Sequence, residues 1–115
     1  MAGLPVLDQP EVACCAPLAA GVLSESDATA VASRFAALAD PVRVRLVSIL
    51  LAAESGAVCV CDLVEPVGRS QGTVSSHLAR LVAAGVCVSE RRGRNVWYSV
   101  NPAALEALRA LLAAA

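Results

Sequence analysis

Four of the five cysteines in this 115-residue chain lie in two close pairs, Cys14–Cys15 and Cys59-x-Cys61. Thiolates are soft ligands that select soft or thiophilic ions. On a regular helix the side chains of Cys59 and Cys61 would point about 160° apart, whereas in an extended chain alternate residues face the same way. The second pair can therefore share an ion only where the backbone is extended or where a helix start is distorted.

The two pairs suit more than one chemistry. Arsenite and antimonite favour three sulfur ligands in a pyramid, and cadmium, lead and zinc can take four. Exposed cysteines of low pKa also act as oxidation sensors without a metal. Cys14 and Cys15 lie in a segment with three prolines and little periodicity, so we expect them to bind an ion. Cys87 lies in a predicted strand, where we expect it to be buried as a small apolar residue.

The composition indicates a single domain with an aliphatic core. The chain is 57% apolar but has only one Phe, one Trp and one Tyr. We interpret the apolar surplus as a subunit interface, with an Ala-rich monomer as the alternative. The longest uncharged stretch, residues 12–24, is too short to span a bilayer. No basic residue precedes Arg34, so we predict no secretory signal and expect a cytoplasmic protein with reduced thiols.

Charge is distributed unevenly along the chain, although the net charge is only −1. Residues 1–30 hold four acidic residues and no basic one, and residues 69–94 hold five arginines and one glutamate. A basic block in an acidic chain is typical of a DNA-binding element. Because the chain has no lysine, phosphate contacts would come from arginines, polar side chains and backbone amides.

Cap residues predict where four helices begin. An N-cap side chain accepts hydrogen bonds from the first free N–H groups of a helix, and proline fits at the first helical position. The predicted N-caps are Ser24, Asp40 before Pro41, Ser70, and Asn101 before Pro102. A short element over residues 61–65 is expected to stop at Pro66, since proline disfavours helix at the residue before it, and Gly68 is expected to form a turn.

Alternating valines predict two strands, over residues 86–88 and 96–100, with the arginine-rich tip 91–95 between them. We therefore expect a flexible arm over residues 1–22 and one domain over residues 23–115. The fold class is mainly α with a β-hairpin, in the order of a winged helix-turn-helix. The apolar faces of the first and last helices are the expected contact of a dimer.

The helix from Ser70 has an apolar back and a polar front. Side chains near the N-terminus of such a helix reach base edges in the major groove, and a basic hairpin lies along the DNA backbone or minor groove. Either feature alone is more often a solvated surface, but the two in this order favour DNA binding. The predicted DNA-binding residues are Ser70, Gln71, Thr73, Ser75, Ser76, His77 and Arg80 on the helix and Arg91, Arg92 and Arg94 in the hairpin.

Four segments together resemble the ArsR/SmtB family of metal-sensing repressors. They are Ala-Leu-Ala-Asp-Pro-Val-Arg (37–43), Cys-Val-Cys-Asp-Leu (59–63), Ser-Gln-Gly-Thr-Val-Ser-Ser-His-Leu (70–78) and Glu-Arg-Arg-Gly-Arg-Asn-Val-Trp-Tyr (90–98). The resemblance implies a dimeric winged helix-turn-helix that binds a palindromic operator and leaves it when an ion binds. Gly72 replaces a usual proline, and Ser76 stands where a histidine is common, so the preferred DNA sequence is expected to differ.

The resemblance also implies a thiolate site at the segment Cys-Val-Cys-Asp-Leu. Arsenic sensors of one branch carry a further cysteine where this chain has Val64, so a third sulfur would come from the other pair. Zinc, nickel and cobalt sensors of the family use ligands on the last helix, where this chain offers only Glu106. The predicted ligands are Cys14, Cys15, Cys59 and Cys61, with As(III) or Sb(III) favoured over Cd(II) or Pb(II).

The predicted function is an arsenite- or antimonite-responsive repressor that binds double-stranded operator DNA as a homodimer. Repression responsive to cadmium or lead, and a thiol-redox response, are the alternatives. We predict no enzyme, because the single histidine, His77, lies on the reading helix and no phosphate-binding glycine loop is visible. The arginine hairpin disfavours a metal buffer without a DNA role. We expect no membrane contact, and no protein partner other than a second copy of the chain is evident.

Overall fold

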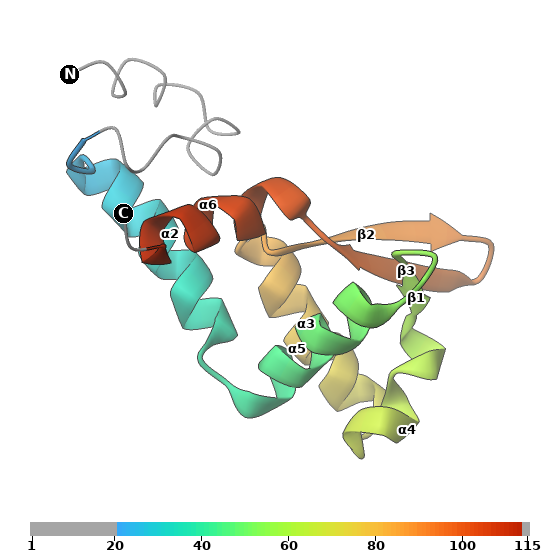
Figure 1. Ribbon diagram of the computed structural model, residues 1–115. Coiled ribbons are helices and arrows are strands. Elements are labelled where there is room, and N and C mark those ends of the chain that lie inside the picture. The colour runs from blue at the N-terminus through green and yellow to red at the C-terminus, as the bar shows by residue number, and fades with distance from the viewer. Residues whose placement is uncertain (1–20, 114–115) are drawn as a thin grey trace.

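The computed structural model describes residues 21–113, in which the helices pack together and a β-hairpin extends away from them (Figure 1). The elements are α2 (Glu25–Leu38), α3 (Pro41–Ala52), β1 (Val58–Cys59), η3 (Val60–Asp62), α4 (Val64–Val67), α5 (Gln71–Ala83), β2 (Cys87–Arg92), β3 (Asn95–Val100) and α6 (Pro102–Leu112). This order confirms the predicted class, mainly α with a β-hairpin in a winged helix-turn-helix. Most of the predicted arm, including Cys14 and Cys15, lies outside the described residues.

All four predicted N-caps are confirmed, since each side chain accepts a backbone hydrogen bond at its helix start. The capping bonds run from the N–H of Asp27 to Ser24 at 3.2 Å, from Val42 to Asp40 at 2.8 Å, from Thr73 to Ser70 at 3.2 Å and from Ala103 to Asn101 at 3.1 Å. These bonds satisfy N–H groups that have no acceptor inside the helix.

The short helix α4 differs from the prediction, because Pro66 is its third residue rather than the point where it stops. The first N–H groups of a helix have no acceptor within it, so proline forfeits no hydrogen bond at this position. Helix α4 ends at Gly68, whose φ of +66° confirms the predicted turn. Arg45 of α3 donates to the Pro66 carbonyl at 2.7 Å and so ties α4 to α3.

The three strands form an antiparallel sheet in the order β1-β3-β2. Strands β2 and β3 reach farther into the predicted tip than expected, so that only Gly93 and Arg94 lie between them. Strand β1 was not predicted: it has two residues, too few for a period, and it depends on pairing with β3, where Cys59 lies opposite Trp97. The sheet thereby joins the first cysteine of the Cys-x-Cys pair to the hairpin, which we call the wing (residues 87–100).

The core is aliphatic, as predicted, and α5 is its best-packed helix. Val74, Leu78 and Leu81, on one side of α5, are each 0% exposed. They pack among buried residues of α3 (Leu46 and Leu50), of α4 and its N-cap (Val67 and Leu63) and of the position just before the wing (Val86). Because these contacts hold the back of α5, its opposite face is left to solvent. Within residues 21–113, every helix is too short or too polar to cross a membrane.

Candidate nucleic-acid interface and thiol pair

The predicted reading residues begin at the N-cap of α5, and most of them are exposed. The Ser70 hydroxyl caps the helix and also donates to the Thr73 hydroxyl at 3.0 Å. The exposed side chains are Gln71, Thr73, Ser76 and Arg80, and Ser75 is half-buried. The N-terminal end of a helix carries a partial positive charge that favours phosphate. The front of α5 thus offers hydroxyl and amide groups to a ligand.

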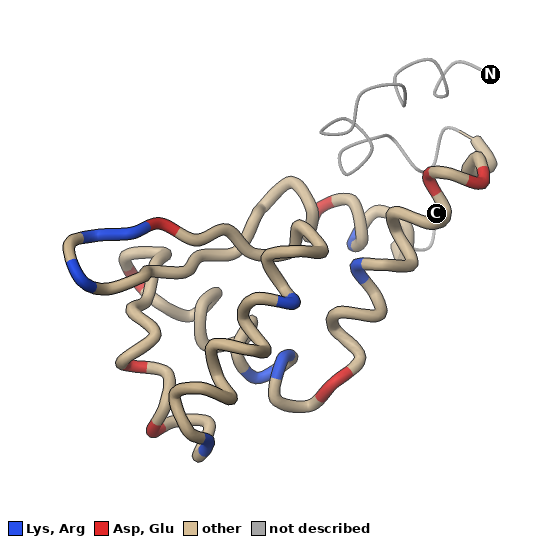
Figure 2. Tube along the Cα trace, turned by 180° about the vertical axis from the view of Figure 1, so that it is seen from behind, with Lys and Arg blue, Asp and Glu red and all other residues tan. Residues whose placement is uncertain are grey.

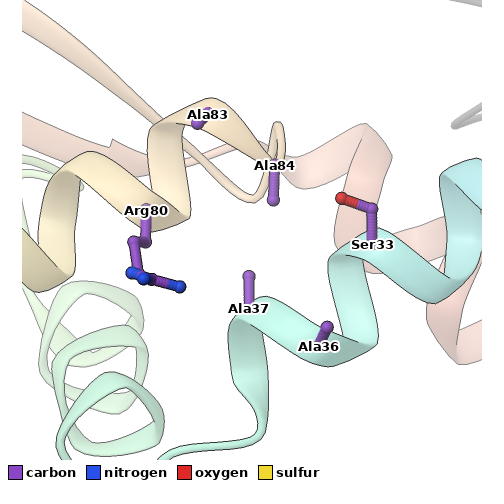
Figure 3. A pocket seen from close by; sticks show the side chains of 6 residues that line it. All are labelled: Ser33, Ala36, Ala37, Arg80, Ala83 and Ala84. Carbon is purple, nitrogen blue, oxygen red and sulfur yellow. The ribbon is translucent and has the colours of Figure 1, made fainter.

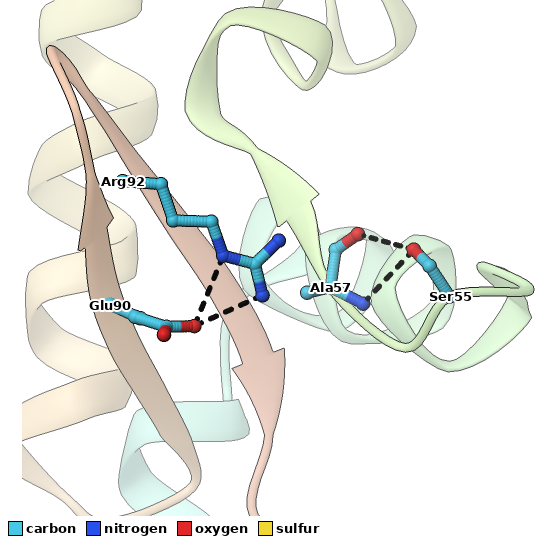
Figure 4. Close-up of polar contacts among 4 residues, drawn as sticks. All are labelled: Ser55, Ala57, Glu90 and Arg92. Atoms are coloured by element: carbon cyan, nitrogen blue, oxygen red, sulfur yellow. Dashed lines mark hydrogen bonds and ion pairs between the residues drawn. The ribbon is translucent and has the colours of Figure 1, made fainter.

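The wing carries the predicted basic tip, with Arg91, Arg92 and Arg94 all exposed. Figure 2 shows this basic run at the end of the hairpin, next to an acidic position. That acid is Glu90, which accepts from Arg92 Nε at 3.1 Å and from Nη2 at 3.0 Å (Figure 4). The Arg92 guanidinium also lies 4.8 Å from the centre of the Trp97 ring. These two contacts fix the orientation of the Arg92 side chain on the wing. Trp97 itself lies in β3 opposite Cys59 of β1.

His77 is half-buried at the edge of α5, and it faces α3. Its Nδ1 lies 3.1 Å from Nη1 of Arg43, and Nε of the same arginine donates to the Ala37 carbonyl at 2.6 Å. His77 was predicted to lie on the DNA-binding surface, and no role was predicted for Arg43. Their separation of 34 residues leaves no periodic signal, and only the position of Arg43 in the segment 37–43 pointed to it.

A groove of about 280 Å³ lies between α2 and α5 (Figure 3). It is lined by Ser33, Ala36 and Ala37 of α2 and by Arg80, Ala83 and Ala84 at the C-terminal half of α5. Figure 3 shows the Arg80 side chain extending toward Ala37. Arg80 therefore lies on the side of α5 that faces α2, whereas Gln71 and Ser76 do not line this groove.

The Cys-x-Cys pair lies where β1 passes into η3, just before α4. Cys59 has an extended backbone, with φ −68° and ψ 142°, and its Sγ accepts from the Cys61 N–H at 3.3 Å. This conformation meets the predicted condition that both side chains face the same way. Reduced thiols were predicted, but the sulfurs of Cys59 and Cys61 are bonded to each other in this structure. The extended backbone at Cys59 holds the two Cα atoms 5.2 Å apart, within the range of disulfides.

The sulfurs of Cys59 and Cys61 differ in exposure and are too few by themselves for a three-sulfur ion site. Cys59 is 1% exposed, whereas Cys61 lies at the surface. The turn that leads into β1 is closed by the Ser55 hydroxyl, which donates to the Ala57 carbonyl at 2.9 Å (Figure 4). Over the part of the chain that the structure describes, no three His, Cys, Asp or Glu residues gather closely enough to hold an ion. A third sulfur would have to come from outside these residues or from a second chain.

Two other titratable groups are accounted for by local contacts. Cys87 is 1% exposed, which confirms its predicted burial, and desolvation raises the pKa of its thiol to about 11. Glu106 on α6 accepts hydrogen bonds from Arg109, which lower the pKa of its carboxyl below the usual value. Cys87 thus remains a thiol at neutral pH, and Glu106 is engaged in an ion pair.

Comparison with known proteins gives one consistent result. Residues 40–87 match the family described as "Bacterial regulatory protein, arsR family". The chain is 41% identical over 68 residues to the arsenic resistance transcriptional regulator ArsR1 of Pseudomonas putida, covering 59% of this chain and 52% of that protein. It is thus similar over little more than half of that relative's length.

Two further similar proteins are covered over more of their own length. The putative arsenical resistance operon repressor ArsR2 of Halobacterium salinarum is 38% identical over 86 residues, which are 75% of this chain and 70% of that protein. The crystal structure of the AntR antimony-specific transcriptional repressor has a TM-score of 0.63 and 32% identity, covering 80% of this chain and 82% of the other. The resemblance inferred from the sequence motifs is therefore confirmed.

Proposed function

Since the chain belongs to the ArsR family of bacterial regulatory proteins, we propose that it is a repressor that binds operator DNA through α5 and the wing. The family consists of transcriptional regulators and not of enzymes. The observation that carries the proposal is the pairing of a rigidly backed polar helix with an exposed arginine hairpin. The helix would read base edges in the major groove, and the arginines would contact phosphates.

The DNA-bound form we propose is a homodimer. A two-fold dimer on a palindromic operator places one reading helix in each half-site. The apolar residues left uncovered near the ends of the described chain support an interface at the first and last helices: Val22 is 81% exposed, Leu111 41% and Leu112 71%. Sedimentation equilibrium would test this. Leu112→Glu should weaken dimerisation, and Val88→Glu, on the exposed side of β2, should leave it intact.

The effector we propose is As(III) or Sb(III), held by Cys59, Cys61 and a cysteine from Cys14 or Cys15. Relatives named for arsenic and antimony support this choice, and the adjacent cysteines Cys14 and Cys15 favour it over cadmium or lead. The adjacent sulfurs of the Cys-x-Cys pair supply two of the three positions of a pyramidal site. Both must be reduced before they bind an ion, since the thiolate is the ligand.

The thiol pair is connected to both DNA-contacting elements. Cys61 lies in η3, directly before α4, so an ion on its sulfur would act at the start of the helix-turn-helix. Cys59 is paired with Trp97 of β3, and Trp97 lies under the Arg92 guanidinium. An ion that draws the two sulfurs into its own geometry would therefore displace the strand that holds the wing as well as the short helix. We propose that these two displacements, one at the wing and one at α4, release the protein from DNA.

A thiol-redox regulator is the second candidate, because the Cys59 and Cys61 sulfurs are bonded in the structure. Hydrogen peroxide would oxidise the two thiols to one disulfide, with both thiol protons and the peroxide oxygens leaving as two water molecules. The disulfide would have the same position relative to β3 and α4 as a bound ion. The two candidates therefore differ in the chemical signal and not in the proposed route to DNA.

One titration distinguishes these candidates. The reduced protein is bound to a fluorescein-labelled duplex from upstream of its own gene, and anisotropy is followed during addition of arsenite, antimonite, cadmium, zinc or peroxide. We expect release by arsenite and antimonite at the lowest concentrations. Release by peroxide alone would favour the redox regulator, and release by cadmium alone the cadmium sensor. No binding to the duplex at low salt would overturn the repressor assignment itself.

A further inference from the structure

We propose that Arg43 positions the reading helix by holding Nδ1 of His77, which turns His77 into a donor-only residue. This inference rests on the proposed DNA-binding function and adds a specificity-determining pair to it. Nη1 of Arg43 and Nδ1 of His77 are 3.1 Å apart and join the first turn of α3 to the middle of α5. No other hydrogen bond between side chains of α3 and α5 exists in the described part of the chain.

Arg43 is itself held by two further hydrogen bonds. Its Nε donates to the Ala37 carbonyl in the last turn of α2 at 2.6 Å. Its backbone N–H donates to the carboxylate of Asp40, the N-cap of α3, at 3.3 Å. Although desolvation raises the pKa of Asp40, hydrogen bonds from Arg43 and Val42 and the charge of Arg43 lower it below the usual value. The guanidinium that meets His77 is therefore anchored to the corner between α2 and α3.

The chemistry of the pair fixes the histidine tautomer. A guanidinium has only donors and does not lose its proton in proteins, so Nδ1 of His77 must be the acceptor. A neutral imidazole with an accepting Nδ1 carries its proton on Nε2. Nε2–H is then the only hydrogen-bonding group that the ring has left, and it is a donor.

A donor-only histidine restricts what the ring can recognise. In the major groove Nε2–H can pair with the acceptors of guanine, with N7 of adenine or with O4 of thymine, and it can pair with a phosphate oxygen. It cannot accept from the amino group of cytosine or adenine. His77 is one turn from Thr73 and Arg80 on α5, so the Arg43 contact also sets the orientation of the helix side that carries them.

The tautomer can be measured without DNA. The chain has a single histidine, so a long-range ¹H–¹⁵N spectrum of tag-free protein shows one imidazole. We expect Nδ1 at the shift of an unprotonated nitrogen and Nε2 at that of a protonated one. Arg43→Ala should give the averaged shifts of a ring that exchanges tautomers. A proton on Nδ1 in the wild-type protein would overturn the proposal, whatever the DNA-binding result.

Two variants at one position separate positioning from direct reading. Asn keeps an acceptor near the place of Nδ1, and Gln keeps a polar group near the place of Nε2. Using the labelled upstream duplex, we expect His77→Ala to lower affinity about tenfold, as for loss of a hydrogen bond to a charged group. His77→Asn should restore most of this loss, and His77→Gln should not. Rescue by Gln alone would contradict a positioning role.

The double variant completes the test. If Arg43 acts through His77, the Arg43→Ala/His77→Ala protein should bind no more weakly than the weaker single variant. Additive losses would contradict the coupling. Circular dichroism melting of each variant checks that it folds, and Arg45→Ala serves as a matched arginine on α3 that contacts Pro66 instead of His77. If the wild-type protein does not bind the duplex, the repressor assignment fails, while the spectrum still tests the Arg43–His77 pair.

Discussion

Helix α5 and the wing, which we propose bind DNA, both present polar groups at the surface, but they are held in opposite ways. Helix α5 has three side chains that are 0% exposed, a capped start and the Arg43 contact at its edge. In the wing, every residue from Val88 to Asn95 is exposed, and its side-chain contacts lie on the surface. Under the proposed function, this difference gives the two elements different roles: α5 is held in one orientation for base reading. The wing would contact phosphates, and its less buried strands would respond to the thiol pair.

The largest expected effect tests how firmly α5 is held. Leu78→Ala should lower the free energy of unfolding by about 2–5 kcal/mol, because it removes a fully buried side chain and leaves a cavity. Val88→Ala, at a residue 47% exposed in the wing, should change it by about 0.5 kcal/mol or less. Urea denaturation measures both. Equal losses for the two variants would remove the contrast between helix and wing.

Arg92→Ala tests the phosphate role of the wing. We expect a loss of roughly tenfold in affinity for the upstream duplex and for unrelated DNA alike, since a phosphate contact is independent of sequence. The slope of log K against log salt should become shallower by about 1. Arg94→Ala provides the matched comparison at the tip, away from Glu90 and Trp97. A loss confined to the upstream duplex would mean that Arg92 reads bases.

Ser70→Ala tests the cap that fixes the start of α5. Loss of the bond from the Thr73 N–H should cost about 1 kcal/mol in unfolding free energy. Ser76→Ala is the control, because Ser76 is an exposed serine of the same helix that does not cap it. Thermal melting followed by circular dichroism compares them. If Ser70→Ala and Ser76→Ala lower the unfolding free energy equally, the cap contributes nothing specific to α5.

The smallest expected effect is a gain in stability at Gly72. A Cβ at this second residue of α5 would meet no heavy atom within 4 Å, so Gly72→Ala should stabilise the protein by up to about 1 kcal/mol. Gly68→Ala is the opposite control: its φ of +66° strains any side chain, and the variant should be destabilised. A loss of stability in both variants would show that Gly72 has a role in the fold that its open surroundings do not reveal.

The sequence was sufficient for features that depend on neighbouring residues and insufficient for those that depend on distant ones. Ser24, Asp40, Ser70 and Asn101 cap helices through atoms two or three residues away, so their role is visible in the local pattern. Strand β1 exists only because β3 pairs with it, and Pro66 is tolerated in α4 because of its place in the first turn.

The candidate site divides in the same way. The exposed front of α5 and the arginine tip follow from helix and strand periodicity, and both were predicted. The contact between Arg43 and His77 spans 34 residues, and the position of Trp97 beneath Arg92 depends on the register of β2 against β3. Neither leaves a signal in spacing or composition. The residues that we propose connect the thiol pair and the corner between α2 and α3 to DNA were therefore visible only in three dimensions.

The most direct test of the account uses Trp97, the only tryptophan, as a reporter of the wing. Arsenite is added to the reduced protein on the labelled upstream duplex, and Trp97 emission and DNA anisotropy are recorded in the same sample. We expect the emission to change and the DNA to be released with one midpoint, and both responses to be absent in Cys59→Ser and Cys61→Ser. Release of DNA without any change at Trp97, or release that persists in both serine variants, would contradict the proposed connection between thiol pair and wing.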